Sequence, residues 1–373
     1  MLKNKIYKYL SVEIFKNFIT ILLTFTAIAW TVRAVNFLDL MIEDGFSASI
    51  YFKYSLLNIF TIITRFIPLS FLIAIIISIT KFERQKELFI LWVTGLNKIK
   101  IVNIFLLIAC LVAIFQLLLG VIINPYTLNK SRALLRDSGS TEIYAVLKPK
   151  AFSDNFQGLT FYIDEKNKNN ELINIFIKDS NNILGTIINE NNGTTDKTIF
   201  AKKGMVLENK LILLNGTIQS LGNNKIKNFN FEKTELSIKN FNTRIIKKTK
   251  VQETSSYKLF ICLLNSTAQN CPYRNNKKIV VETLSRRLGM PLYIPLIAAI
   301  SSFLLIHQKE RKNNFLSKYI VFSSAFIILV FTEILLKYTG FSNIHFTIYF
   351  LLPLVLLILI YSILFKKMIS QTI

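Results

Sequence analysis

Long apolar stretches alternate with polar connections along this chain of 373 residues. A helix needs about 20 predominantly apolar residues to cross the hydrocarbon core of a bilayer. Six stretches are long enough, three on each side of a polar middle region: Phe18–Val35, Leu56–Thr80, Ile99–Ile123, Leu288–Ile306, Tyr319–Leu336 and Phe346–Phe365. The pattern predicts six membrane-spanning helices.

In the middle region, apolar residues recur with a shorter period. Between about Tyr144 and Lys248, apolar and polar residues alternate, which is typical of half-buried strands. Turns rich in Asn, Asp and Gly separate the alternating runs, which are Leu159–Ile163, Ile173–Ile177, Met205–Leu207, Lys210–Leu214 and Phe229–Phe231. Many short strands at this spacing indicate a sandwich or jelly roll.

These two patterns predict an α-helical integral membrane protein of six transmembrane helices with an inserted all-β, jelly-roll-like domain. Residues 1–125 hold the first three spans and a short cytoplasmic helix at about 82–97. Residues 126–285 hold the β domain with its connecting segments, and residues 286–373 hold the last three spans.

Basic residues fix the orientation, because Lys and Arg near the ends of spans resist translocation. They gather in the N-terminal tail, the second-to-third connection, the fourth-to-fifth connection and the C-terminal tail. The loop at Asp39–Ser55 is acidic instead. Both termini are therefore predicted to be cytoplasmic, and the β domain to lie outside.

The formal charge of +23 raises the alternative of nucleic-acid binding. Much of the excess lies beside span ends, where it meets anionic lipid headgroups. Membrane lipids are the expected partners of these residues, and no nucleic-acid partner is expected.

Catalytic chemistry is not evident. The two histidines, His307 and His345, have no nucleophile at interpretable spacing, and no Gly-rich phosphate loop occurs. Cys110 lies inside the third span, whereas Cys262 and Cys271 either form a disulfide or remain free thiols. We expect no cofactor and no metal site, and any ATP hydrolysis belongs to a separate subunit.

Three ionisable residues interrupt the apolar spans: Arg33, Arg65 and Glu333. Such groups are costly in hydrocarbon and usually face a cavity or a partner. One interpretation is a polar lining for an amphiphile whose anionic headgroup is held by the arginines. The alternatives are snorkelling to the interface and an Arg–Glu pair.

The segment Lys81–Asn97 starts charged, continues apolar and stops at Gly95, as an amphipathic helix does. It either lies in the lipid interface or docks in a groove of a cytoplasmic subunit. In the second case the coupling residues are Arg84, Glu87, Leu88 and Gly95, with Glu87 as a polar anchor.

The order of several short motifs resembles the lipopolysaccharide export permeases of the YjgP/YjgQ type, more closely the F member of that pair than the G member. The motifs run from the first to the fourth span: Thr31–Val35, Ile67–Ser70, Lys86–Leu88 with Gly95–Asn97, Asn124–Pro125 and Leu284–Leu292. Arg33 matches a basic position of the family, whereas Asn97 stands where Ser is common.

This resemblance implies a permease subunit of an ABC transporter in the bacterial inner membrane. It would form a heterodimer with a sister permease, their first and fifth spans enclosing a cavity that extracts lipopolysaccharide. A cytoplasmic ATPase dimer would drive the cycle through the helix containing Glu87. Periplasmic jelly-roll proteins would accept the lipid and carry it toward the outer membrane.

Two other functions stay open at this point. One is a membrane-anchored sensor or assembly scaffold whose outer domain binds a ligand, although six spans exceed what a tether needs. The other is a mechanotransmitting ABC permease that moves no lipid.

Overall fold

The computed structural model describes residues 2–42, 46–139, 149–156, 158–167, 171–180, 197–207, 210–222, 225–237, 250–264, 277–306 and 314–369. The chain divides into two compact units. The helical unit comprises residues 1–32, 58–129 and 250–373, and the second unit comprises residues 33–57 and 130–249. Each is described by itself.

Within the described residues, six helical segments are long and apolar enough to cross a membrane, which confirms the six predicted spans. The first three contain α1 (Leu2–Asn36), α3 (Ala48–Arg84), α5 (Lys98–Leu118), the π-helical turn η1 (Leu119–Ile123) and α6 (Asn124–Gly139). The last three contain α9 (Lys277–Gly289), η6 (Met290–Leu292), α10 (Tyr293–Ser301), η7 (Ser302–Leu305), α11 (Asn314–Tyr338) and α12 (Asn343–Ile369). Shorter elements are α2 (Asp39–Ile42), α4 (Glu87–Val93), η4 (Val251–Glu253) and α8 (Ser256–Leu264).

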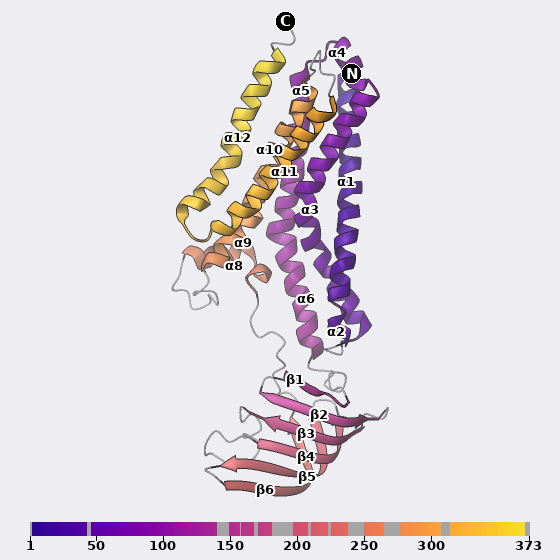
Figure 1. Cartoon of the computed structure of the whole chain (residues 1–373), viewed down its shortest axis with the longest axis vertical. Helices are drawn as coiled ribbons and strands as arrows, with labels where there is room; N and C mark the ends of the chain where they lie inside the picture. Colours follow the sequence, from indigo (N-terminus) through magenta and orange to yellow (C-terminus); the bar gives the residue numbers. More distant parts are fainter. Residues whose placement is uncertain are drawn as a thin grey trace. The chain divides into compact units, whose positions relative to one another are not determined.

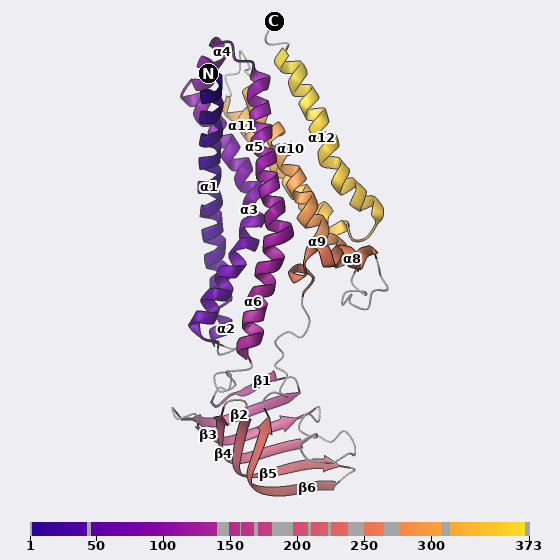
Figure 2. The same ribbon diagram turned by 180° about the vertical axis from the view of Figure 1, so that it is seen from behind.

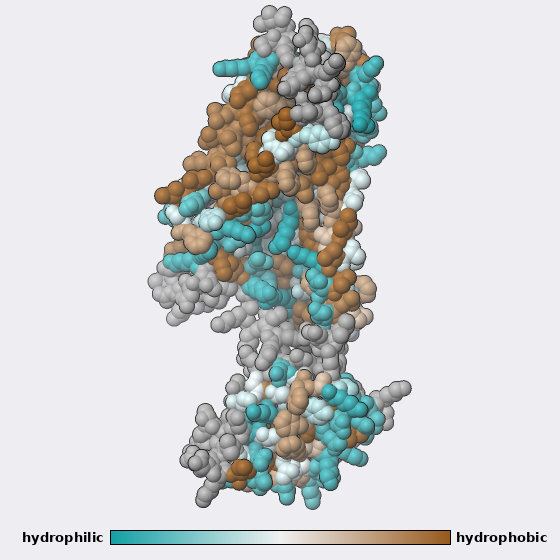
Figure 3. Space-filling model, in the orientation of Figure 1, coloured by the Kyte–Doolittle hydropathy of each residue, from teal (hydrophilic) through white to brown (hydrophobic). Residues whose placement is uncertain are grey.

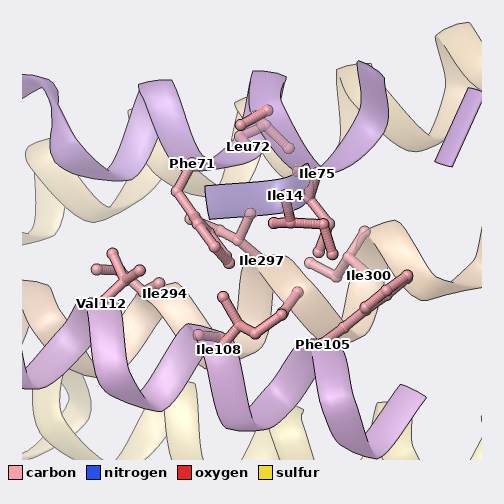
Figure 4. Packing of buried hydrophobic residues seen from close by; sticks show 14 of the residues in the cluster. Ile14, Phe71, Leu72, Ile75, Phe105, Ile108, Val112, Ile294, Ile297 and Ile300 are labelled. Atoms are coloured by element: carbon pink, nitrogen blue, oxygen red, sulfur yellow. The ribbon is translucent and has the colours of Figure 1, made fainter. Parts of the chain in front are cut away.

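The fourth span forms the centre of the helical unit. Its most apolar window is 72% buried, against 17–22% for the first, fifth and sixth spans. A helix that is apolar all round can be enclosed by other helices as well as by lipid. Ile294, Ile297 and Ile300 of α10 lie among apolar side chains of α1, α3 and α5, including Ile14, Phe71 and Phe105 (Figure 4).

Close packing continues where the fourth span meets α12. A Cβ on Gly289 would lie 2.2 Å from Cε1 of Tyr349, so only glycine fits at this contact. The Tyr293 hydroxyl donates a hydrogen bond to the Tyr349 carbonyl at 2.9 Å. Because hydrocarbon offers no partner to a polar group, this bond satisfies the Tyr293 hydroxyl inside the unit.

Polar contacts join the helices at the end of the unit that carries α4, where α1 begins and α12 ends (Figure 1). Lys81 of α3 pairs with Glu13 of α1, and Lys318 of α11 pairs with Glu83 of α3 at 2.7 Å. The rest of the visible surface of this unit is mainly apolar and is interrupted by a hydrophilic patch (Figure 3).

The second unit contains one antiparallel sheet of six strands in sequence order. The strands are β1 (Phe152–Phe156), β2 (Leu159–Lys166), β3 (Glu171–Asp179), β4 (Lys197–Leu207), β5 (Lys210–Gly222) and β6 (Lys225–Ser237). The five alternating runs of the sequence all lie within β2–β6, which confirms the inserted β domain. Residues 181–196 and 238–249, between and after these strands, lie outside the described residues.

The sheet is strongly curved (Figure 2), and its inner face forms a core of its own. Phe161, Ile177 and Leu213 are among twelve buried residues of this face. The curvature brings these side chains toward one another.

A row of residues across the strands accounts for the bend. Asn174 and Asn215 have positive φ values of 51° within β3 and β5. The register of the flanking pairs places both opposite Lys202 of β4 and places Asp164 of β2 opposite Asn174. Asn tolerates the left-handed region better than other non-glycine residues. The row therefore forms a line along which neighbouring strands bend. We call this row, which includes Asn174, Lys202 and Asn215, the crease.

We predict that Asn215→Val destabilises the sheet, because a β-branched residue at this φ costs on the order of 1–2 kcal/mol. Asn215→Gly is the matched control and is expected to retain wild-type stability. Limited proteolysis of the full-length protein during a thermal ramp measures the difference. Equal protease resistance of the Val and Gly variants would show that the crease does not depend on the left-handed residue.

Candidate functional site

A polar cavity of about 340 Å³ lies within the helical unit. Its lining joins the second, third, fourth and fifth spans with the segment that precedes α8. The lining residues are Thr61, Thr64, Arg65, Gln116, Gly120, Asn124, Leu128, Gln252, Ile279, Glu282, Thr283, Arg286, Arg287, Met290 and Glu333. Three arginines and two glutamates in one cavity are unusual for a membrane-spanning unit, where charged residues mark functional sites.

The third span forms one wall through the π-helical turn η1. Such turns widen a helix and occur frequently at functional sites. On either side of η1, Gln116 Nε2 donates to the Thr64 carbonyl at 3.2 Å and Asn124 Nδ2 donates to Thr64 Oγ1 at 2.9 Å. The two amides thus fix the third span against α3 at the cavity.

Both amides retain an acceptor. Gln116 and Asn124 are only 4% and 9% exposed, and among the described residues Gln116 Oε1 and Asn124 Oδ1 have no hydrogen-bond partner. A buried acceptor without a partner is costly. Both oxygens are themselves buried, so the unsatisfied acceptors lie within the packing around the cavity.

Arg286 and Glu333 form a bidentate ion pair between α9 and α11. Arg286 Nη1 lies 3.2 Å from Glu333 Oε1, and Nη2 lies 3.1 Å from Oε2. Paired bonds of this kind combine charge with fixed geometry. The side chains are 36% and 44% exposed, so the pair remains accessible.

Arg287, one residue later, is buried at 8% exposure. Its guanidinium donates to the carbonyls of Thr254 and Gln252 at 3.0 and 2.8 Å and to Ser256 Oγ at 2.7 Å. Ser256 in turn donates to the Val121 carbonyl of η1 at 3.0 Å. Arg287 therefore ties the segment entering α8 to the third and fourth spans.

The structure brings together two of the three ionisable residues predicted from the spans. Arg65 and Glu333 line the same cavity, and Glu333 pairs with Arg286, an arginine outside the predicted set. Sequence reasoning missed Arg286 and Arg287 as site residues, although the adjacent arginines before an apolar run were a usable signal. Arg33, in α1, belongs to the second unit, and its role stays a prediction.

The segment predicted as one amphipathic helix is divided in the structure. α3 continues through Arg84, and α4 starts at Glu87 after Lys86, whose φ of 57° breaks the helix. At the other end, Gly95 has a φ of 78°, a conformation that favours glycine. Two left-handed residues thus separate α4 from the spans on either side.

The predicted coupling residues differ in their surroundings. Leu88 is buried in the core of the helical unit, and Glu87 Oε1 accepts a hydrogen bond from the Tyr9 hydroxyl at 3.1 Å. Phe89, Ile90 and Val93 are exposed large apolar side chains of the same helix. One side of α4 is therefore anchored, and the other is an uncovered apolar surface.

Comparison with known proteins identifies the family. The model of the lipopolysaccharide export system permease LptF/LptG matches residues 8–367. The chain belongs to this family. The match does not distinguish LptF from LptG, and no curated protein matches the chain.

Membership makes this LptF/LptG chain a membrane permease, a transporter subunit rather than an enzyme. Within the part of the chain that the structure describes, no group of three His, Cys, Asp or Glu residues could hold a metal ion. Cys110 is a free cysteine and Cys262 is disulfide-bonded. Cys271 and His307 lie outside the described residues.

We predict that substitutions of the two adjacent arginines differ in how much they lower stability. Arg287→Met removes the buried guanidinium from two backbone carbonyls and the Ser256 hydroxyl and is expected to cost about 3 kcal/mol or more. Arg286→Met removes a partly exposed ion pair and is expected to change stability by about 1 kcal/mol or less. Thermal denaturation of the two purified variants, monitored by size-exclusion chromatography, measures this difference in stability. Equal melting temperatures would contradict the anchoring role of Arg287.

Proposed function

We propose that this chain is the permease subunit of an ABC transporter that extracts lipopolysaccharide from the bacterial inner membrane and passes it to a periplasmic bridge. The observation that carries the proposal is the arginine-lined cavity within an apolar helical unit of the lipopolysaccharide export family. An amphiphile with an anionic headgroup has the chemistry that such a lining binds.

The orientation rests on the distribution of basic residues and on the arrangement of the helical unit. The start of α1, helix α4 and the end of α12 share one end (Figure 1). Lys81, Lys98, Lys318 and Lys367 lie near the span boundaries of that end. The positive-inside rule makes this end cytoplasmic, so the β domain, inserted between the third and fourth spans, is periplasmic.

The Arg286–Glu333 ion pair allows the partner of Arg286 to be exchanged when substrate binds. A phosphate oxygen can replace a glutamate oxygen as the partner of Arg286, since guanidinium binds both groups through paired bonds. Arg65 contributes further positive charge to the same lining. Substrate binding at this cavity would therefore give Arg286 a phosphate partner and release the carboxylate of Glu333 within a lining that also holds Arg65.

The route into the complex is assigned to the first and fifth spans, which with the sixth are the three least buried. The apolar windows of the first and fifth spans are each only 22% buried in the single chain. We infer that a sister permease covers part of these surfaces and that the two chains enclose a lateral entrance for the lipid. Arg33, toward the end of α1, is assigned to the same entrance. The apolar inner face of the β-sheet is assigned to the acyl chains along the onward path to periplasmic jelly-roll partners.

Coupling to a cytoplasmic ATPase dimer is assigned to α4. Its exposed Phe89, Ile90 and Val93 form the kind of apolar helix surface that docks in a groove. Glu87 fixes this helix to α1 through Tyr9, and Leu88 fixes it to the core. A displacement of α4 by the ATPase can thus be transmitted to the spans as a rigid-body motion.

We predict that Arg65→Ala and Arg33→Ala each reduce crosslinking of lipopolysaccharide to the permease severalfold, because each removes a cation from the proposed path. The measurement uses a photoreactive amino acid at Thr283, a cavity residue, in cells expressing the complete complex. Lys53→Ala, a basic residue outside the cavity lining, is the matched control. Undiminished crosslinking in both arginine variants would favour snorkelling and would remove these residues from the path.

We predict that Glu87→Ala weakens co-purification with the ATPase or uncouples ATP hydrolysis from export, because α4 loses its bond to α1. Tyr9→Phe removes the same hydrogen bond from the other side and is expected to give a milder form of the same defect. Arg33→Ala is the contrasting control, with lipid crosslinking reduced and ATPase assembly intact. Normal assembly and transport by Glu87→Ala would exclude this residue from coupling. Purification of the chain without a sister permease or ATPase, but with a soluble ligand, would instead favour a sensor.

A further inference from the structure

A row of aromatic side chains crosses the face of the β-sheet that is opposite to its buried core. In the strand register, Phe152 is paired with Tyr162, and Phe176 with Phe200. Tyr162 and Phe176 are in turn paired with each other. Neighbouring residues of a strand point to opposite faces, and the neighbours of this row in β2, β3 and β4 belong to the core. We call these four residues the aromatic row, and the face that carries them the outer face.

The rings of the aromatic row contact one another, yet two of them remain open to solvent. Ring centroids lie 5.0 Å apart for Phe152 and Tyr162 and 5.1 Å apart for Phe176 and Phe200. Phe152 is 70% exposed, and Phe200 is 46% exposed. Exposed apolar groups that gather on one surface and are rimmed by polar residues mark interaction sites and ligand-binding grooves. The outer face is therefore a candidate site.

A hollow of about 520 Å³ is lined by both the aromatic row and the crease. Ile175 and Ala201 separate the two along β3 and β4. Their side chains belong to the core, so their main chain forms the floor of the hollow. At the corresponding place in β5, a Cβ on Gly216 would lie 2.2 Å from the Phe200 carbonyl oxygen. No side chain therefore fills the floor there.

The crease supplies the polar groups of the hollow. Asn174, Lys202 and Asn215 are all exposed. Asn174 Nδ2 donates to Asp164 Oδ2 at 3.2 Å, which holds this amide in place and leaves its oxygen as an acceptor. Asn215 and Lys202 add a second amide and an ammonium group. Hydrogen-bond donors and acceptors thus line the hollow together with the aromatic rings.

This combination of groups matches a sugar ring. A pyranose has C–H groups on its faces, which pack against the negative face of an aromatic ring. The hydroxyl groups around its edge pair with amides and ammonium groups. An acyl chain would instead cover the amides and Lys202 without replacing the hydrogen bonds that they make to water. The inner face, with its apolar core, suits an acyl chain better.

The size of the hollow favours a saccharide over a protein. Sites for small molecules typically enclose about 300–1,000 Å³, and the hollow falls within that range. A protein interface takes about 20–30 residues from each side, whereas eleven described residues line the hollow. A short saccharide therefore fits the lining better than a protein surface does.

We propose that the hollow binds the saccharide part of the exported glycolipid, with a sugar ring stacked on Phe200 and its hydroxyl groups bonded to Asn174, Lys202 and Asn215. The choice of this glycan rests on the proposed function, because the exported lipid is the saccharide that the permease would bring to the β domain. The two faces of one sheet would then bind different parts of the same molecule, sugars outside and acyl chains inside.

The test measures how the full-length protein in nanodiscs binds the oligosaccharide released from lipopolysaccharide by deacylation. Saturation-transfer difference NMR is expected to show transfer from the wild type to the C–H groups of the sugar rings. Phe200→Leu keeps an apolar side chain but loses the aromatic face, and is expected to raise the Kd about two- to tenfold. Phe200→Tyr is expected to retain wild-type affinity. Phe229→Leu is the matched control, because Phe229 is an exposed phenylalanine (47%) of the same sheet outside the lining.

A second variant tests the polar side of the hollow. Asn215→Gly removes the amide but suits the positive φ, so it is expected to weaken binding about two- to tenfold without lowering protease resistance. Three results would each overturn the proposal. They are no binding by the wild type, equal affinities of Phe200→Leu and Phe229→Leu, and binding of maltohexaose in preference to the lipopolysaccharide oligosaccharide.

Crosslinking in cells separates this site from transport itself. A photoreactive amino acid at Thr217, which is paired with Phe200 in the sheet, is expected to crosslink lipopolysaccharide in cells expressing the complete complex. A crosslink at Thr217 to protein alone, with the lipopolysaccharide crosslink at Thr283 retained, would overturn the saccharide site and leave the proposed function standing. Absence of lipopolysaccharide crosslinks at both positions would count against the proposed function as well.

Discussion

A guanidinium buried among packed apolar helices must have its donors satisfied by the protein, because apolar side chains supply no acceptor. Arg287 meets this constraint by donating to two carbonyls and to the Ser256 hydroxyl. Ser256 in turn donates a hydrogen bond to η1 of the third span. These bonds fix the return of the chain from the β domain against the third and fourth spans. The polar cavity depends on this anchoring, since Gln252, Gly120 and Arg287 all belong to its lining.

Adjacent arginines serve different purposes because their partners differ in accessibility. Arg287 is enclosed by acceptors of fixed position, whereas Arg286 pairs with a single glutamate on α11. The first arrangement resists exchange and the second permits it. A transporter needs both, because the framework has to persist while the contacts to the cargo change. The most buried span, at the centre of the unit, supplies both arginines from its first helix.

The sequence was sufficient for the spans and for most strands, because hydropathy and alternation report burial directly. It missed β1, whose sequence Phe-Ser-Asp-Asn-Phe lacks clear alternation and forms the edge of the sheet. The break between α3 and α4 was also missed, because nothing in the residue type of Lys86 indicates a positive φ.

The candidate site was predictable only in part. Arg65 and Glu333 were predicted only because an ionisable group is costly inside an apolar span, and both line the cavity. The partner of Glu333 lies 47 residues earlier, on another span, and helix packing rather than local pattern brings the two together. Gln116 was equally hidden, since it is uncharged and belongs to an otherwise apolar stretch, and Asn124 stood out only as part of the Asn124–Pro125 motif.

The crease of the β-sheet limits how this domain can change in evolution. Asn174, Lys202 and Asn215 bend the sheet together only while the strands keep their register. An insertion or deletion within one strand would move its member out of line and would force an unsuited neighbour into the left-handed conformation. Length variation among related domains should therefore collect in the turns between strands, and the distance from each turn to the bend should be preserved.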